Sequence, residues 1–313
     1  MPGELTVDGE ALLRVSRVVN SAGDLETLID RVLDELMEAF GYPHVSLMLA
    51  EESGERLVTL ASRGYVIEGV GSEESLGEGL VGAAVKSRQV VSVGNLQREL
   101  RYAQAATRPQ RVAERPMEER PAVQIPLPRL SEAESLLVAP LAVRGELVGA
   151  LVIESREPLA FGRSDEVAVE LIAQHLAARV IEVSLEDEEA AGRTRGDGDA
   201  GSAGPLSRFV FYQVDDSVFL DDEYLIRGVP GRILWRLLTE YSSTGRRDFS
   251  NRELRMSPWI GLPTLRDNLE SRLILLRRRL DEKQTPVRIE RTGRGRFSLV
   301  LDGPIDLLER DSP

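Results

Sequence analysis

The chemistry that the sequence offers most plainly is recognition of a polyanion by arginine. The segment NLESRLILLRRRL (268–280) joins an apolar run to three consecutive arginines, and further basic residues follow it. Guanidinium and ammonium groups gathered on neighbouring elements bind phosphates and release their counterions. The basic residues of this region are Arg266, Arg272, Arg277, Arg278, Arg279, Lys283, Arg288, Arg291, Arg294 and Arg296.

The distribution of charge separates this region from the rest of the chain. The formal net charge is −13, yet residues 206–303 hold 18 Lys and Arg against 14 Asp and Glu, a balance of 18 − 14 = +4. The remainder therefore carries −13 − 4 = −17. An acidic protein with one basic segment is expected to bind a polyanion only through that segment.

No residue set typical of an enzyme active site or a metal centre is evident. The chain has no cysteine, which rules out disulfides, zinc–thiolate sites, iron–sulfur clusters and a thioether-linked chromophore. Its two histidines, His44 and His175, are interpreted as a strand-edge residue and a helix residue rather than as ligands. Without a Ser/His/Asp or Cys/His arrangement or a P-loop, we expect neither catalysis nor a bound cofactor.

The segment GEGLVG (77–82) satisfies the dinucleotide-binding pattern G-x-G-x-x-G, but its surroundings do not fit that role. A dinucleotide-binding loop follows a parallel strand and is itself followed, about twenty residues later, by an acidic side chain. Here a polar loop, GVGSEESL, precedes the glycines. We therefore interpret them as the turn into a short helix.

The elements that carry these residues fall into two segments. Residues 8–185 read as two helices, a pair of strands, a short helix, further strands ending in a hairpin at Arg144-Gly145, and a final helix with Ser164 as its N-cap. This order predicts an antiparallel sheet with helices on one side, an α+β fold. Residues 186–205 lack large apolar side chains and predict a flexible linker before residues 206–303.

Nothing in the sequence predicts a membrane protein. The start, MPGELTVDGE, is acidic and does not resemble a signal peptide. The longest apolar stretch, SLLVAPLAVRGELVGALVI, has Arg144 and Glu146 at its centre, where a membrane span would not place them. We expect a soluble, cytoplasmic protein.

Residues 8–185 resemble the GAF family of sensory domains. The matching pieces are LGEGLVGAAVKSRQVVSV (76–93), NLQRELRY (95–102) and LLVAPLAVRGELVGALVIES (136–155) followed by the last helix, with Asn95 where the family commonly has aspartate. The resemblance implies signal sensing by a small-molecule effector, which stays unidentified, or dimerisation through the first and last helices. The proline-rich stretch 103–135 corresponds to a lid over the ligand pocket or to a disordered insertion.

The second segment reads as short strands, three helices and a terminal hairpin. RFVFYQVDDSVFLDDEYLIRG alternates apolar and polar residues, GVPGRILWRLLTEYSSTG has helical spacing, and Ser250 with Glu253 forms a capping box. A third helix spans about 263–283, and VRIERTGRGRFSLVL folds back on itself as a hairpin.

This order, with ILWRLLTEYSSTGRRDFSNREL and I-x-R-T-G-R-G-R-F-S-L, resembles the OmpR-type winged helix-turn-helix of response regulators over about 208–301. The resemblance implies binding of double-stranded DNA, with the third helix in the major groove and the hairpin, or wing, near the minor groove. The residues expected to contact DNA are Arg266, Asn268, Ser271, Arg272, Arg278, Arg291 and Arg294.

A helical wheel divides the apolar run of the third helix in two. Leu265, Leu269, Leu273, Leu276 and Leu280 share one face and predict a core contact. Ile274 and Leu275 fall on the opposite side, where the family usually has polar residues or arginine. We expect them to be exposed, facing either DNA or a protein partner.

Together these features predict a one-component transcriptional regulator that acts as a homodimer. Its N-terminal domain senses a signal and its C-terminal domain binds DNA. The alternative is a signalling protein in which the winged helix binds a protein partner through Ile274 and Leu275 rather than DNA.

Overall fold

The chain divides into two compact units, residues 1–180 and 181–313. The computed structural model describes residues 8–51, 54–99, 101, 125–190, 205–260 and 269–311. The expected linker at 186–205 falls largely outside the described residues, but its first five residues continue the preceding helix, which ends at Ala190. Most of the expected lid, 103–124, is also outside them.

Three helices of the first unit form in the segments where helical spacing predicts them. Helix α1 (Gly9–Ser21) begins after Asp8, whose side chain accepts hydrogen bonds from two backbone N–H groups, and α2 (Leu25–Phe40) begins after Asp24, whose side chain accepts one from the backbone N–H of Thr27. Helix α2 ends at Gly41, which has the left-handed conformation (φ 71°) that glycine adopts without strain. The third, α5 (Arg163–Ala190), starts one residue before Ser164, so the prediction of Ser164 as its N-cap is wrong; Asp165 instead accepts from the Gly162 backbone N–H.

The sheet of the first unit has six antiparallel strands in the order β3-β2-β1-β6-β5-β4. The predicted hairpin at Arg144-Gly145 joins β5 to β6, with positive φ at both residues, and the glycines at 77–82 lead into the short helix α3, as predicted. The strands and this helix are β1 (His44–Ala50), β2 (Arg56–Arg63), β3 (Glu73–Ser75), α3 (Gly79–Ser87), β4 (Val91–Val93), β5 (Ser135–Val143) and β6 (Glu146–Ser155).

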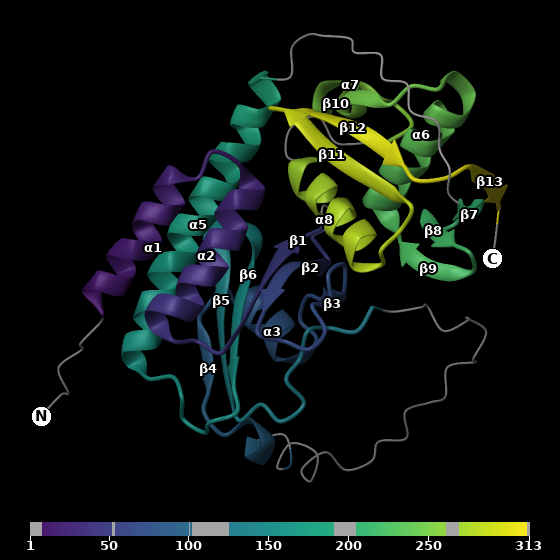
Figure 1. Cartoon of the computed structure of the whole chain (residues 1–313). Coiled ribbons are helices and arrows are strands. Elements are labelled where there is room, and N and C mark those ends of the chain that lie inside the picture. Colours follow the sequence, from purple (N-terminus) through teal and green to yellow (C-terminus); the bar gives the residue numbers. More distant parts are fainter. Residues whose placement is uncertain are drawn as a thin grey trace, which may run out of the picture. The chain divides into compact units, whose positions relative to one another are not determined.

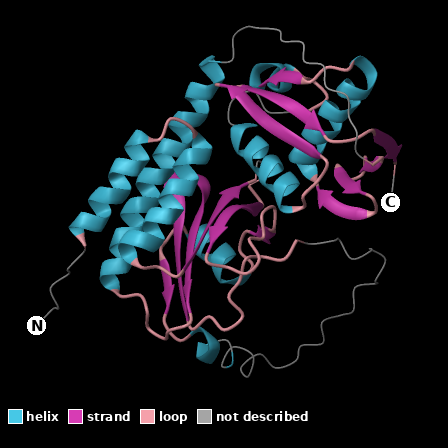
Figure 2. Cartoon of the chain, viewed as in Figure 1, coloured by secondary structure: helices cyan, strands magenta, loops and turns pink. Residues whose placement is uncertain are grey.

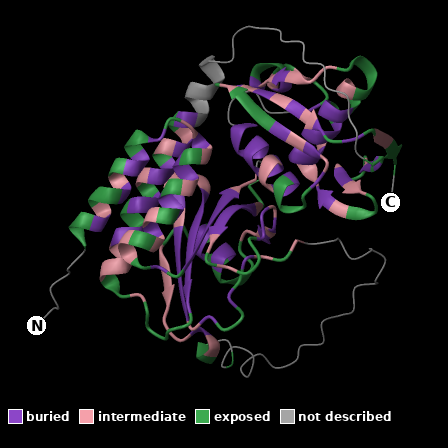
Figure 3. Cartoon of the chain, viewed as in Figure 1, coloured by how far each residue is buried: buried purple, intermediate pink, exposed green. Residues whose placement is uncertain are grey.

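The two faces of this sheet are covered by different parts of the chain. Helices α1, α2 and α5 lie together on one side, whereas α3 lies on the other (Figure 1; Figure 2). The α3 side carries an apolar cluster built from α3, β1, β5 and β6, together with residues 127–133. We call residues 125–134 the strap. The strands between the two layers are buried along most of their length (Figure 3).

The described residues of the second unit form two sheets and three helices. One sheet has the order β13-β7-β8-β9 and the other β10-β12-β11. The capping box predicted at Ser250 is present, with Glu253 N–H donating to Ser250 Oγ and Ser250 N–H donating to Glu253. The elements are β7 (Ser207–Tyr212), β8 (Ser217–Leu220), β9 (Glu223–Ile226), α6 (Gly228–Thr244), β10 (Asp248–Ser250), α7 (Asn251–Met256), α8 (Leu269–Glu282), β11 (Val287–Gly293), β12 (Arg296–Leu301) and β13 (Ile305–Arg310).

Strand β13 is a feature that the sequence patterns do not indicate. It pairs with β7 in parallel, with Ile305 opposite Ser207 and Arg310 opposite Tyr212. The second unit therefore extends beyond residue 303, where the predicted domain ends. Among the described residues, no helix is both long and apolar enough to pass through a bilayer.

Candidate functional site

The first unit buries a group of polar side chains at one end of its sheet, on the face covered by α3. His44 and Ser46 on β1 point to this face, as does Glu154 on β6, because His44 and Glu154 are paired across the two central strands. All three are buried, with 9%, 2% and 7% of their surface exposed. Polar groups at such positions need partners, since an unpaired group inside a protein loses its hydration.

The strap supplies partners for the buried carboxyl groups. The backbone N–H of Leu130 donates a 3.1 Å hydrogen bond to Glu154 Oε2. The adjacent Arg129 donates from Nη2 to Oε2 of Glu74, at 2.9 Å, and Glu74 on β3 is itself buried. The strap is thus fixed to the sheet through two glutamates, neither of which is close to it in sequence.

The strap packs directly against the backbone of the loop between β2 and β3, at Gly69. A Cβ atom at Gly69 would lie 2.7 Å from the carbonyl oxygen of Pro126 and 2.6 Å from the ring of Pro128. Gly69 also has φ of +63°, a conformation that glycine adopts without strain. Any larger residue would push the strap away from the polar cluster.

Burial shifts the proton equilibria of the cluster. It raises the pKa of Glu154; the Leu130 N–H, Tyr65 and Arg129 oppose this rise, and the nearby charge of Glu74 adds to it. Burial, followed by the charge of Glu154, also raises the pKa of the Tyr65 hydroxyl well above its usual range. The carboxyl groups of Glu154 and Glu74 therefore interact electrostatically in a region that water reaches poorly.

His44 lies beside these groups with its ring against Tyr65, the ring centroids being 5.3 Å apart. It begins β1, as expected, but β1 is a central strand and the side chain is buried. Burial lowers the pKa of His44, and the charge of Arg156 lowers it further, whereas a hydrogen bond to the backbone of Glu154 opposes the shift. The imidazole is therefore neutral over a wider pH range than usual. His175, in contrast, lies on α5 as predicted.

Three atoms of the cluster are buried without a hydrogen-bond partner among the described residues: His44 Nδ1, Glu74 Oε1 and the hydroxyl oxygen of Tyr65. Such atoms are uncommon in folded proteins and call for an explanation. Among the described residues, no group of three or more His, Cys, Asp or Glu side chains is placed to hold a metal ion. The cluster offers hydrogen-bond acceptors and negative charge, which suit a ligand that donates hydrogen bonds.

Sequence reasoning did not single out Glu74, Glu154, Tyr65 or Arg129. One signal was available, because Glu154 is a charged residue near the end of the apolar strand ELVGALVIES and falls on its inward face. The partner residues carry no such signal, because their proximity depends on how the strap folds back over the sheet.

A wider, open groove lies at the other edge of the strap. It has a volume of about 500 Å³ and contains both acidic and basic side chains at the surface. No buried polar side chain lines it, so it lacks the fixed polar groups of a specific site. Its lining residues are Gln97, Arg101, Ser131, Glu132, Glu134 and Arg156.

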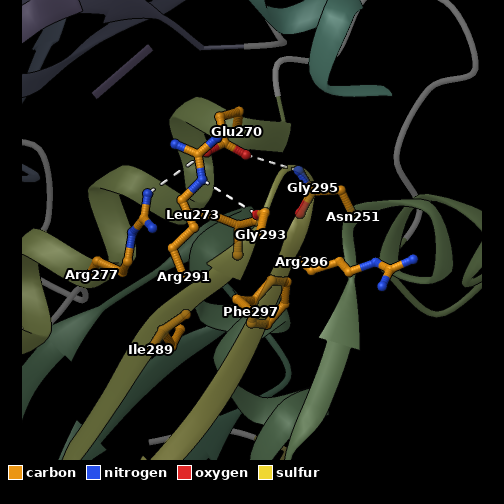
Figure 4. A pocket seen from close by; sticks show the side chains of 10 residues that line it. All are labelled: Asn251, Glu270, Leu273, Arg277, Ile289, Arg291, Gly293, Gly295, Arg296 and Phe297. Carbon is orange, nitrogen blue, oxygen red and sulfur yellow. Dashed lines mark hydrogen bonds and ion pairs between the residues drawn. The ribbon is translucent and has the colours of Figure 1, made fainter. Parts of the chain in front are cut away.

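In the second unit, a polar network joins the start of α8 to the start of α7. Glu270 accepts a 2.8 Å hydrogen bond from Asn251 Nδ2 and lies 3.7 Å from Arg277 Nη2 (Figure 4). Asn251 N–H in turn donates to the carbonyl of Gly295 in the turn between β11 and β12. The cavity beside Glu270 measures about 10 Å³, room for about one water molecule, so it is no ligand pocket.

The structure distributes the predicted DNA-binding residues unevenly. Arg291 and Arg294 are exposed at the end of the β11–β12 hairpin, and Arg278 is half-buried on α8. Ser271 and Arg272 are both buried, each with 7% of its surface exposed. Arg266 and Asn268 lie outside the described residues.

The prediction that Ile274 and Leu275 are exposed is wrong, because they are 0% and 5% exposed. A helical wheel places residues on the faces of one helix in isolation, whereas burial depends on everything that packs around that helix. The predicted core leucines of α8 are buried as well: Leu269, Leu273, Leu276 and Leu280. The alternative function, binding of a protein partner through these two residues, therefore loses the exposed apolar pair on which it depended.

Comparison with known proteins identifies one family. The model of the GAF domain matches residues 24–180. Among solved structures, the GAF domain of an Acinetobacter phosphoenolpyruvate-protein phosphotransferase is 22% identical; the alignment covers 59% of this chain and 96% of that one, with a TM-score of 0.45. A free methionine-R-sulfoxide reductase from Neisseria meningitidis is 20% identical, with 58% and 97% covered and a TM-score of 0.43. No curated protein sequence matches the chain.

Proposed function

This chain belongs to the GAF domain family, and on that premise we propose that it is a one-component transcriptional regulator. In this proposal the GAF domain senses a small-molecule signal, and residues 206–311 form a winged helix that binds double-stranded DNA. We assign no catalytic reaction to the chain.

The observation that carries the DNA-binding part is the order of elements in the second unit. Three antiparallel strands (β7 to β9) precede helices α6, α7 and α8, and the hairpin β11–β12 follows, with β12 also paired to β10. A winged helix has helix-turn-helix elements followed by such a hairpin, and its arginines contact phosphates. The exposed Arg291 and Arg294 at the hairpin support this assignment, as does the excess of basic over acidic residues in the segment 206–303.

The burial of Ser271 and Arg272 adds a requirement to the proposal. A buried side chain cannot reach a base edge, so contact between α8 and the major groove requires a conformational change that exposes this helix. The hairpin arginines need no such change. We therefore expect weak, sequence-independent binding through the hairpin and tighter binding only when α8 is accessible.

Fluorescence anisotropy of the full chain with labelled mixed genomic fragments tests this function. At about 50 mM salt we expect saturable binding that weakens steeply by about 200 mM, as counterion release requires. The double substitution Arg291→Ala and Arg294→Ala should reduce the slope of log affinity against log salt by about 2. A control that removes the same charge elsewhere, Arg208→Ala with Arg236→Ala, should leave the slope unchanged. Absence of binding at the lower salt concentration overturns the proposal.

Homodimerisation is part of the same proposal. Leu13 on α1 and Leu171 on α5 are 50% and 51% exposed, on helices that lie together on one side of the sheet. Large apolar side chains at such positions suit a symmetric helix–helix contact. Native mass spectrometry should give the mass of a dimer, and Leu13→Glu with Leu171→Glu should give that of a monomer.

A further inference from the structure

Glu74 is a buried carboxylate that has fewer hydrogen-bond donors around it than its two oxygens can accept. Its side chain is 7% exposed, Oε2 accepts from Arg129, and Oε1 has no hydrogen-bond partner among the described residues. A carboxylate can accept about four hydrogen bonds, so one bond leaves most of its capacity unused. The unused oxygen lies beside the start of α3, since a Cβ on Gly79 would lie 2.8 Å from it.

A second carboxyl group lies close by. Glu154 is buried, accepts from the Leu130 N–H and interacts electrostatically with Glu74. The only cation that pairs with either carboxylate among the described contacts is Arg129. Two acidic groups and one guanidinium leave this part of the cluster short of positive charge and of hydrogen-bond donors.

Arg129 is placed so that another cation can take over its role. Its side chain is 57% exposed while that of Glu74 is 7% exposed, so the ion pair is open to solvent on the arginine side only. Arg129 also comes from residues 125–130 of the strap, which have neither helical nor strand structure. Its guanidinium can leave Glu74 without breaking a strand pair of the sheet.

We propose that Glu74 and Glu154 form a binding site for a small organic cation, a guanidinium compound or a primary alkylamine, and that Arg129 is the tethered competitor for it. A bound cation donates hydrogen bonds to both oxygens of Glu74 and displaces Arg129, which loosens the strap. This deepens the sensory role of the GAF domain and rests on that part of the proposed function. Anionic ligands are excluded at this point because two carboxyl groups repel them.

Calorimetric titration of the full chain near neutral pH with methylguanidinium and n-butylamine tests the site. Arg129→Ala should bind either cation about tenfold more tightly than the unsubstituted chain, because the competitor is gone. Neutral n-butanol and anionic propionate should give no saturable heat with either protein. Equal or weaker binding of both cations by Arg129→Ala overturns the proposal.

Removal of the carboxylate completes the test. Glu74→Gln in the Arg129→Ala background should abolish saturable binding. Glu73→Gln in the same background should not, because Glu73 pairs with Arg56 instead. Should Glu74→Gln fail to fold, as judged by circular dichroism, Glu154→Gln in the Arg129→Ala background takes its place and should weaken binding severalfold. Retention of full affinity after loss of the carboxylate would falsify the assignment.

DNA titrations of the same proteins separate this inference from the proposed function. Binding of cations without any binding of DNA retains the site and overturns the regulator. Binding of DNA without saturable binding of cations retains the regulator and overturns the site.

Discussion

The two units of the molecule hold their buried charges in different ways. In the second unit, Arg279 is 6% exposed; its Nε donates to the carbonyl of Leu225 on β9, and its Nη1 donates to Glu282 on the same helix. In the first unit, Glu74 is as deeply buried, but its partner Arg129 belongs to the strap and is mostly exposed. One charge is held by regular structure and the other by a segment without it.

This difference suggests different purposes. A buried guanidinium that donates to a backbone carbonyl on one regular element and to a carboxylate on another position of its own helix resists change, because its removal leaves these acceptors without their donor. A buried charge whose partner is in contact with water can exchange that partner, because the departing group is hydrated as it leaves. The first arrangement suits a scaffold, and the second suits a site that responds to a ligand.

The largest effect is expected at Arg279. The substitution Arg279→Ala leaves the Leu225 carbonyl and Glu282 without this donor and should destabilise the second unit by about 3 kcal/mol. Both tryptophans, Trp235 and Trp259, lie in that unit, so their fluorescence during urea unfolding reports its stability alone. Arg278→Ala, one position away and half-buried, is the matched control. If Arg279→Ala lowers the stability of the second unit no more than Arg278→Ala does, the hydrogen bonds of Arg279 do not stabilise that unit.

A smaller effect is expected at Arg129. Because water reaches its guanidinium, Arg129→Ala should cost about 1 kcal/mol or less, measured by far-ultraviolet circular dichroism during urea unfolding. The tryptophan signal should not change. If Arg129→Ala costs as much as Arg279→Ala, the proposed contrast between the two units fails.

At Glu154 the effect appears as a dependence on pH. Its pKa is raised above 4.5 by burial, so the folded state retains the proton more strongly than the unfolded state does. The stability from this group is fully present below about pH 4.5 and is lost as the pH rises through the raised pKa of the folded state. Glu154→Gln does not titrate, so its Tm relative to that of the unsubstituted chain should rise between about pH 5 and pH 8.

Differential scanning calorimetry at several pH values measures this trend. Glu132→Gln, an exposed carboxyl of the strap, provides the control and should show no such dependence. A constant difference in Tm for Glu154→Gln across the range would mean that burial does not perturb this carboxyl.

The smallest effect is expected at the ion pair between Arg288 and Asp302. Arg288 donates two hydrogen bonds to this carboxylate, at 2.6 and 2.7 Å, and these lower the pKa of Asp302. Both side chains are exposed, however, and solvent screens such pairs strongly. Arg288→Ala should leave the unfolding transition unchanged at both low and high salt. A clear, salt-sensitive loss of stability would show that bidentate geometry outweighs screening here.

Sequence reasoning succeeded where the determining interactions are local. The glycine turn into α3, the capping box at Ser250 and the hairpin at Arg144-Gly145 each depend on residues a few positions apart. Helical periodicity also identified four of the five buried leucines of α8, all except Leu275. These signals were sufficient to place most elements of both units.

The same reasoning failed where distant segments meet. The partners of Glu154 and Glu74 come from the strap, 24 and 55 positions away in sequence. The burial of Ile274 depends on neighbours that a helical wheel does not contain, and strand β13 lacks a turn signal that links it to β7. The chemistry of the candidate site therefore depends on tertiary contacts, whereas its scaffold could be predicted.

The parallel pairing of β13 with β7 has a consequence for synthesis on the ribosome. All strands of the first sheet have been made once residue 155 is translated, so that unit is able to collapse early. The sheet that contains β7, β8 and β9 lacks its fourth strand, β13, until Arg310 emerges, roughly a hundred residues after β7. During that interval the outer edge of β7 has no partner in the nascent chain and is open to pairing with other polypeptides. Trigger-factor-like chaperones, or a pause in translation, would therefore benefit the second unit more than the first.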